Sequence, residues 1–339
     1  MGVFRYVLSS MVVWFHLVGG HMCWGYSAVF GFYLISGYVI TYVLEGKYKE
    51  HKTVKFYKNR LLRLLPTYYI YVVLTVLVIV MLGNSYVLAL PQNIAQYGAK
   101  QFLNDLVLGF FTDKTNPALW LNGFPRIVPQ AWSLWPQFVF YLVAPFLVRL
   151  HRYSKKLYGI FVTIMALPPI CFYFLKMDFG TYGYRSLLGV FVIFLVGSCI
   201  FYLKDYLPKI KYPGILFSVL AFAYVGVVTF WGRDYISQKQ IYVAFVIQVL
   251  IVASSTQLSL KGIIGRLDRI AGNISYGVFM GHFMAAMLVQ IIAERLLPID
   301  EMPLTGKKFG IAVIILQTII ASAGYYLVEK RIEKLRKKN

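Results

Sequence analysis

Arg5 and His16 are two ionisable side chains within the first apolar segment of the chain, where ionisable groups are costly. Their separation of eleven residues returns an α-helix to nearly the same face, about 16 Å further along its axis. Imidazole titrates near neutral pH, so His16 can act as a general base that takes a proton from a hydroxyl nucleophile. The other interpretation is that His16 only forms a hydrogen bond between two helices.

His282 lies near the middle of a later apolar segment and allows the same two interpretations, a functional imidazole or a hydrogen bond between helices. The remaining histidines, His21, His51 and His151, lie between apolar segments. We expect ordinary solvated roles for these three.

Arg60 and Arg63 lie one helical turn apart in a basic stretch that leads into an apolar segment. Two guanidinium groups on one helix face can clamp a phosphate through paired hydrogen bonds. The competing interpretation is that they anchor the helix at the cytoplasmic face of a membrane. Pro66 follows them and is suited to open a membrane span. Near the end of the chain, Glu329 can pair with such an arginine.

Several common sites are absent from the sequence. There is no P-loop, no glycine-rich dinucleotide fingerprint and no His/Glu spacing typical of a metal site. The three cysteines, Cys23, Cys171 and Cys199, are widely spaced within apolar runs, which argues against a disulfide framework. We therefore expect no metal, and neither nucleotide-driven transport nor metal-dependent hydrolysis.

The elements that must position these residues are membrane helices. With 59% hydrophobic and 14% charged residues, the chain has too little polar surface for a soluble globule of 339 residues. A hydrocarbon core of about 30 Å needs about 20 apolar residues in a helix. Ten segments meet this length, at approximately 3–20, 24–44, 64–83, 131–150, 157–176, 184–203, 212–231, 240–258, 272–293 and 309–328. The sequence thus predicts one all-α integral membrane domain over residues 1–339.

The distribution of positive charge predicts how these helices are oriented. Most of the 34 Lys and Arg residues fall on one side if the N-terminus is cytoplasmic, chiefly in a basic loop at about 45–63 and a tail at 330–339. An even number of spans then places both termini in the cytoplasm. The net charge of +21 therefore indicates contact with anionic membrane lipids and not with nucleic acid. The longest break, at about 84–130, becomes an extracytoplasmic loop, in which Phe102–Phe111 suggests an interfacial or re-entrant helix.

Five local strings, taken in order, resemble one known family. They are Arg5 with His16; Val29–Ile40, which contains Ser36, Gly37 and Tyr38; Phe56–Tyr68, which contains Arg60 and Arg63; Ala131–Tyr141, which contains Trp132, Ser133 and Leu134; and Ile274-Ser275-Tyr276 with His282-Phe283 and Glu329. In this order and spacing they are similar to the motifs of the membrane acyltransferase family 3, the prokaryotic carbohydrate O-acyltransferases. The resemblance covers essentially the whole chain, and ten spans is what it implies.

The chain departs from the family pattern at Gln137, where the family usually has a glutamate three residues after Trp-Ser-Leu. A glutamine can hold a substrate hydroxyl or orient a histidine, but it cannot take a proton at neutral pH. We also expect a stand-alone form, without an extracytoplasmic esterase-like domain.

The resemblance implies transfer of an acyl group, most often acetyl, from cytoplasmic acyl-CoA to a hydroxyl of an extracytoplasmic or lipid-linked glycan, at the inner membrane of a prokaryote. Acetyl-CoA would then be a co-substrate, and the oligomeric state is open. On this basis we predict catalytic, donor-binding and acceptor-binding residues. The catalytic set is His16, Arg5 and His282; the donor set is Arg60, Arg63, Arg5, Ser36 and Tyr38; and the acceptor set is Gln137, Trp132, Trp120 and Arg126.

Other functions remain open at this stage. The intramembrane histidines and the arginines also fit an exporter of a polysaccharide or lipid-linked sugar, in which they would relay protons and hold an anionic substrate. An inert interaction scaffold is a third interpretation. Within the enzyme hypothesis, direct transfer and a covalent acyl-enzyme both fit the sequence.

Overall fold

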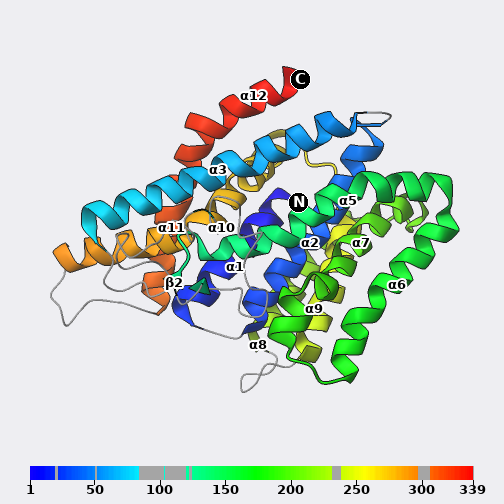
Figure 1. Cartoon of the computed structure of the whole chain (residues 1–339), viewed down its shortest axis with the longest axis horizontal. Coiled ribbons are helices and arrows are strands. Elements are labelled where there is room, and N and C mark those ends of the chain that lie inside the picture. Colours follow the sequence, from blue (N-terminus) through cyan, green and yellow to red (C-terminus); the bar gives the residue numbers. More distant parts are fainter. Residues whose placement is uncertain are drawn as a thin grey trace. The chain divides into compact units, whose positions relative to one another are not determined.

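The computed structural model of the chain describes residues 1–19, 22–49, 52–83, 103, 120–121, 124–230, 238–296 and 306–338 (Figure 1). This part is almost entirely helical. The α-helices are α1 (Gly2–Val18), α2 (Met22–Glu45), α3 (Thr53–Leu82), α5 (Leu134–Tyr153), α6 (Lys155–Phe174), α7 (Leu187–Leu203), α8 (Pro213–Phe230), α9 (Gln238–Ser255), α10 (Gly262–Leu296), α11 (Lys307–Gly324) and α12 (Lys330–Lys338).

Short elements complete this description. Two 3-10 helices, η2 (Pro129–Ser133) and η4 (Lys204–Tyr206), and two π-helices, η3 (Phe179–Arg185) and η6 (Tyr325–Glu329), adjoin the long helices. The strands β1 (Trp120–Leu121) and β2 (Phe124–Pro125) form one short antiparallel pair. In the described part of the chain this pair is the whole of the β-structure, so the predicted all-α class is confirmed.

The predicted membrane spans agree with the helices. Within the described residues, nine helical segments are long and apolar enough to cross a bilayer, and α1 is a shorter apolar helix of 17 residues. These ten helices coincide with the ten predicted segments. An apolar α1 of 17 residues is about 25 Å long, at the lower limit for a span. The orientation of the termini stays a prediction.

The start of α3 corrects one prediction. The helix begins at Thr53, so most of the expected basic loop at about 45–63 is helical, and Pro66 lies inside the helix instead of opening it. Apolar length measures only the part of a helix that faces hydrocarbon, whereas helical hydrogen bonding continues through the polar residues before it. Because proline has no N–H, the carbonyl of Leu62 loses its usual helical partner within α3.

Some predictions lie outside the described residues. These are the expected interfacial helix at Phe102–Phe111, apart from the backbone of Leu103, most of the expected loop at about 84–130, and the histidines His21 and His51.

Backbone packing divides the chain into two compact units, and each is described by itself. Unit 1 contains Met1, His21–Lys58 and Pro136–Arg269, and unit 2 contains Gly2–Gly20, Asn59–Trp135 and Ile270–Asn339. The helices α3, α5 and α10 contribute residues to both. The prediction of a single domain is not tested by this division.

In unit 1, α2 and α7 pack backbone against backbone. A Cβ atom on Gly37 of α2 would meet the carbonyl of Phe194, and one on Gly197 of α7 would meet the carbonyl of Leu34. Thr41 donates a hydrogen bond to Ser198 (Oγ1 to Oγ, 2.7 Å) across the same contact. The two glycines thus let α2 and α7 touch, as is typical where small residues face each other in membrane helices.

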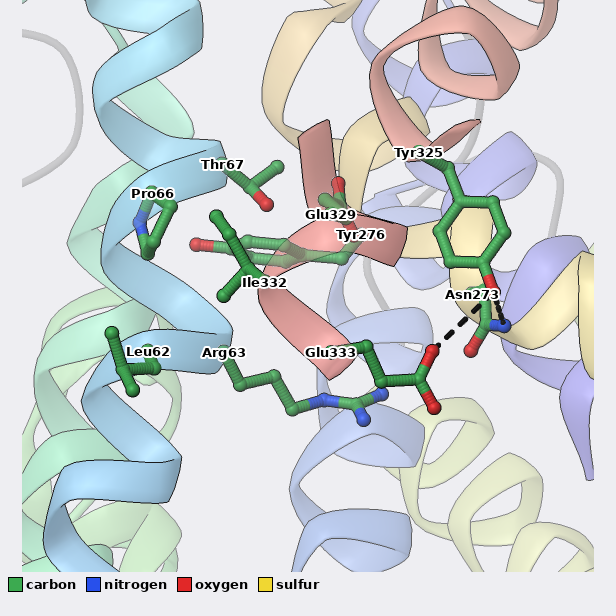
Figure 2. A pocket seen from close by; sticks show the side chains of 10 residues that line it. All are labelled: Leu62, Arg63, Pro66, Thr67, Asn273, Tyr276, Tyr325, Glu329, Ile332 and Glu333. Carbon is green, nitrogen blue, oxygen red and sulfur yellow. Dashed lines mark hydrogen bonds between the residues drawn. The ribbon is translucent and has the colours of Figure 1, made fainter. Parts of the chain in front are cut away.

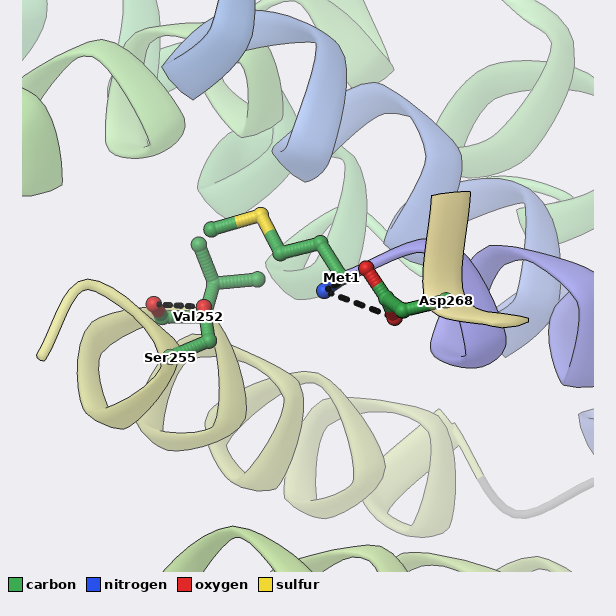
Figure 3. A network of polar contacts seen from close by, with 4 residues as sticks. All are labelled: Met1, Val252, Ser255 and Asp268. Atoms are coloured by element: carbon green, nitrogen blue, oxygen red, sulfur yellow. Dashed lines mark hydrogen bonds and ion pairs between the residues drawn. The ribbon is translucent and has the colours of Figure 1, made fainter. Parts of the chain in front are cut away.

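Polar contacts also join distant parts of unit 1. Gln248 of α9 donates to the carbonyl of Ser27 (2.7 Å), and the Ser27 hydroxyl lies 2.9 Å from the hydroxyl of Tyr224 of α8. Figure 3 shows the Met1 ammonium group facing Asp268, with the nitrogen 3.3 Å from Oδ1. In the same view Ser255 donates to the carbonyl of Val252 (2.7 Å). These bonds satisfy polar groups that lipid cannot.

In unit 2, α1, α10 and α11 surround one apolar core. Its buried members come from all three helices and from α3, and they are Val13, Leu17, Ile79, Ile274, Val278, Phe283, Ala285, Ala286, Met287, Phe309, Val313 and Ala321. Gly310 of α11 faces Val18, and Gly272 of α10 faces the backbone of Gly2. Gln317 of α11 donates to the carbonyl of Gly277 (2.7 Å), so the amide nitrogen of this buried side chain has a partner.

The α2–α7 contact predicts different results for two glycine substitutions. Gly37→Ala places a methyl group against the Phe194 backbone and should lower the free energy of unfolding by about 1–3 kcal/mol. Gly226→Ala on α8 is the matched control, because nothing lies within 4 Å of its Cβ position; it should be neutral or slightly stabilising. Thermal unfolding in detergent measures both, and equal midpoints for the two variants would contradict the packing described.

Candidate functional site

His16 and His282 form a pair of stacked imidazoles in unit 2. His16 lies in the last turn of α1 and His282 lies within α10. Their ring centroids are 5.3 Å apart and their planes differ by 15°. His16 is exposed, whereas His282 has no exposed surface. The tertiary structure therefore stacks the exposed imidazole of His16 on the buried imidazole of His282.

The hydrogen bond of His282 fixes its tautomer. Its Nδ1 lies 2.8 Å from the carbonyl oxygen of Phe279, and because a carbonyl only accepts, Nδ1 carries the proton. In the neutral ring, Nε2 is then the atom with the lone pair. Within the described part of the chain this buried Nε2 has no hydrogen-bond partner. The ring is therefore held in one orientation, and its basic atom is buried.

Aromatic side chains enclose the histidine pair. The Phe283 ring centroid is 5.1 Å from that of His16 and 4.4 Å from that of His282. The Phe15 ring also contacts His16, at 4.9 Å between centroids. Such apolar surroundings strengthen electrostatic and hydrogen-bonding interactions of the imidazoles.

Arg5 lies on the same helix as His16, as the spacing predicted. It is half-buried near the start of α1, and its carbonyl accepts a hydrogen bond from Ser9 (3.1 Å). The Ser9 hydroxyl is also 2.7 Å from the carbonyl of Ser275 on α10. Ser9 and Ser275 are both fully buried. This contact fixes the position of α1 along α10, and hence of His16 beside His282.

Arg63 lines a pocket in unit 2 (Figure 2). The pocket lies between α3, α10 and the segment formed by η6 and α12, and its lining residues are Leu62, Arg63, Pro66, Thr67, Asn273, Tyr276, Tyr325, Glu329, Ile332 and Glu333. Figure 2 shows the Arg63 guanidinium extending toward Glu333. Glu329 lines the same pocket as Arg63, and its pairing with an arginine stays a prediction.

Hydrogen bonds hold the wall of this pocket. Asn273 donates to the hydroxyl of Tyr325 (2.7 Å), and that hydroxyl lies 3.5 Å from Glu333 Oε2. Tyr276 donates to the carbonyl of Leu64 (3.3 Å), close to the proline in α3. The cavity is about 40 Å³, room for only a few water molecules. A ligand as large as a diphosphate needs the wall to move.

Arg60 has a different environment from Arg63. It is 8% exposed, it does not line this pocket, and its Nη2 donates to Asn59 Oδ1 (3.0 Å). The one-turn spacing of the two arginines on a helix is present in α3. Joint binding of a phosphate by both stays a prediction.

The segment before α5 packs against α10 near His282. Gln130 donates a hydrogen bond to the carbonyl of Met280, two residues before His282, and Ser133 donates to the carbonyl of Gln130 (2.9 Å). Trp132 of η2 is half-buried, and Arg126 is 2% exposed. Both predicted acceptor residues therefore lie in the segment that Gln130 joins to α10. Trp120 belongs to β1, where only the backbone is described.

Unit 1 holds the remaining predicted residues. The amide nitrogen of Gln137 lies 3.3 Å from Ser36 Oγ and 2.5 Å from the Tyr141 hydroxyl. The predicted donor residue Ser36 and the predicted acceptor residue Gln137 are thus direct neighbours. Tyr38 instead packs on Phe201, with ring centroids 6.0 Å apart.

The sequence analysis did not select Ser9, Gln130, Asn273 or Glu333. Ser9 lies between Arg5 and His16, and Gln130 precedes the Trp-Ser-Leu string, so both were near selected motifs. Their partners are 266 and 150 residues away. That separation left no local signal for the contacts.

Comparison with known proteins gives one family. A family model described as an acyltransferase domain matches residues 1–325 of the chain. An uncharacterized protein of Aquifex aeolicus is 26% identical over 234 residues, which cover 66% of this chain and 92% of that protein. No solved structure matches.

The Ser9–Ser275 contact predicts the effect of a substitution on stability. Ser9→Ala removes a buried donor and leaves the Ser275 carbonyl with one partner fewer, which should cost roughly 1 kcal/mol. Ser10→Ala is the control, because Ser10 bonds to the carbonyl of Tyr6 in its own helix (3.1 Å). Thermal unfolding in detergent should show the larger loss for Ser9→Ala. The reverse order would refute the proposed link between α1 and α10.

Proposed function

The chain belongs to the acyltransferase 3 family, and we propose that it transfers an acyl group from cytoplasmic acyl-CoA to a hydroxyl of an extracytoplasmic or lipid-linked glycan. Family membership and the apolar helices support a multi-pass membrane acyltransferase. Acetyl-CoA as donor, the glycan as acceptor and the inner membrane of a prokaryote are our proposal. We also propose that both termini are cytoplasmic, because of the distribution of Lys and Arg.

The observation that supports this function best is the stacked pair of histidines. Acyl transfer to a hydroxyl needs a base at the moment when the oxygen attacks. His16 is the exposed member of the pair, so an acceptor hydroxyl can reach it, and the rings of Phe15 and Phe283 lie beside it.

We assign the steps of direct transfer as follows. His16 takes the proton of the acceptor hydroxyl while the hydroxyl oxygen forms a bond to the thioester carbonyl carbon. The carbon–sulfur bond then breaks, the acyl group stays on the oxygen, and the departing thiolate receives the proton from His16. The products are the ester and free CoA, so no other reactant is consumed.

His282 has a positioning role in this mechanism. It is fully buried, and its Nδ1–H is held by the carbonyl of Phe279. Its ring stacks on His16 and so limits how that imidazole can be oriented. Ser9 and Gln130 support the same arrangement, because each joins a separate segment to α10.

The donor's phosphates are assigned to Arg63, Arg60 and Arg5. Arg63 shares its pocket with Glu329 and Glu333. A phosphate that binds Arg63 would have to displace these two carboxylates from the surroundings of the guanidinium group. The π-helix η6 ends at Glu329, and π-helical turns are frequent at functional sites. We propose that movement of the segment after η6 opens this pocket to the donor.

Reconstituted protein tests the function directly. Liposomes with acetyl-CoA on one side and a hydroxyl-bearing glycan on the other should yield acetylated glycan, detected by mass spectrometry. His16→Ala should lower the transfer rate by about 10²–10⁴-fold, because the base is lost. His151→Ala is the histidine control, since His151 stacks on Tyr202 in unit 1, and it should keep the wild-type rate.

Two outcomes would overturn the assignment. The first is movement of unmodified glycan without any dependence on acetyl-CoA, which is the behaviour of an exporter. The second is a wild-type transfer rate in a folded His16→Ala variant, with folding checked by thermal unfolding.

Gln137 in unit 1 gives a second test of the proposed function. Gln137→Ala removes the hydrogen bonds to Ser36 and Tyr141 and should lower the transfer rate by up to about tenfold. Gln137→Glu should restore most of the rate, because a carboxylate can accept from both hydroxyls. The glutamate variant should also gain an ionisation in its pH–rate profile. A rate that is unchanged in Gln137→Ala would remove this residue from the site.

A further inference from the structure

A pocket with two arginines lies in unit 1, and none of its lining residues was assigned a role above. It is lined by the end of α2 and the turn that follows it, by the start of α3, and by the last turns of α5. Its lining residues are Leu44, Tyr48, Thr53, Pro145, Val148, Arg149 and Arg152. Its cavity volume is about 260 Å³, close to the lower limit for pockets that hold small organic ligands. We call it the Arg149 pocket.

Arg149 supplies a positive charge to this pocket. Its Nη2 donates to Thr53 Oγ1 (3.0 Å), and its guanidinium lies 5.9 Å from the centre of the Phe146 ring. Both neighbours are uncharged, and among the described residues no carboxylate forms a salt bridge with Arg149. The guanidinium therefore keeps its charge and has donors left for an anion.

Arg152 lies one turn further along α5 and is held in place by Glu45. Its Nη2 and Nε both donate to Glu45 Oε2, at 2.7 and 3.0 Å. The other oxygen of Glu45 accepts a hydrogen bond from Tyr202 (3.2 Å). The described residues thus bring the guanidinium groups of Arg149 and Arg152 and the one carboxylate that binds Arg152 to this pocket, so their net charge is positive.

The rest of the lining is apolar or aromatic. Leu44, Pro145 and Val148 form part of the wall, and Tyr48 presents a ring. On the turns of α5 that precede Arg149, Leu142 is 54% exposed and Phe146 is 61% exposed. The Arg149 pocket therefore lies where an exposed apolar helix face meets a basic helix end. This combination suits a phosphate that is attached to a less polar group.

We propose that the Arg149 pocket binds the phosphate of a phosphate ester, with Arg149 and Thr53 as its ligands and Arg152 as a second cation. The ester has two available sources, the headgroup of an anionic membrane lipid and a soluble nucleotide. None of these residues belongs to the histidine site or to the donor residues assigned above, so a failure of this proposal leaves the proposed function standing. Arg152 is fixed by Glu45, so Arg149 is the better residue to change.

Two probes distinguish the sources. The soluble probe is adenosine 3′,5′-bisphosphate, whose binding to the purified full chain is measured by calorimetry. The lipid probe is phosphatidylglycerol in nanodiscs that otherwise contain phosphatidylcholine, and its retention is measured by native mass spectrometry. Arg149→Gln should weaken binding of one of the two probes by about tenfold, through loss of a charge-assisted pair of hydrogen bonds.

Further variants keep the test interpretable. Thr53→Val preserves shape and removes only the hydroxyl, so it should weaken the same probe by a smaller factor even if Arg149→Gln fails to fold. Lys156→Gln is the control, because Lys156 is exposed on α6 and does not line the pocket. A loss confined to the bisphosphate supports a nucleotide, and a loss confined to phosphatidylglycerol supports a lipid. Unchanged binding of both probes in the Arg149 and Thr53 variants, or an equal loss in Lys156→Gln, overturns the proposal.

Discussion

The constraint on which this structure depends is that polar groups inside a bilayer must find partners within the protein. Helices satisfy the backbone, and the polar side chains of each span must then meet groups on other helices. Ser9 reaches the carbonyl of Ser275, Gln130 reaches that of Met280, and Gln248 reaches that of Ser27. Each bond fixes one helix or segment along another. The contacts that avoid an unpaired polar group in the bilayer therefore also set the register between the helices.

This constraint explains why a histidine pair can serve as a site here. His282 uses its Nδ1–H on a carbonyl of its own helix, and its ring then supports His16 by stacking. The register set by Ser9 decides that the two rings meet. Phe15 and Phe283 contribute apolar surface beside them. The chemistry proposed for His16 would thus depend on bonds made several turns from it.

The arginines show that equal residue types take different roles. Arg60 is buried and bonds to Asn59, Arg63 shares a pocket with two carboxylates, and Arg149 bonds only to neutral neighbours among the described residues. A guanidinium whose charge is already neutralised supports structure, whereas one that keeps its charge can attract an anion. The positive-inside pattern treats all three alike, because it records charge and not partners.

The sequence by itself determined the all-α membrane class, the ten apolar segments, the family and most of the candidate residues, because apolar length and motif spacing are local properties. It also predicted that Arg5 and His16 share a helix. Only the tertiary structure brought His282 to His16, placed Gln137 beside Ser36 and put Pro66 inside α3, where helical hydrogen bonding runs on through polar residues. These facts depend on which helices pack together and in what register. That choice is made by buried contacts between residues far apart in the chain, and they leave no local signal in the sequence.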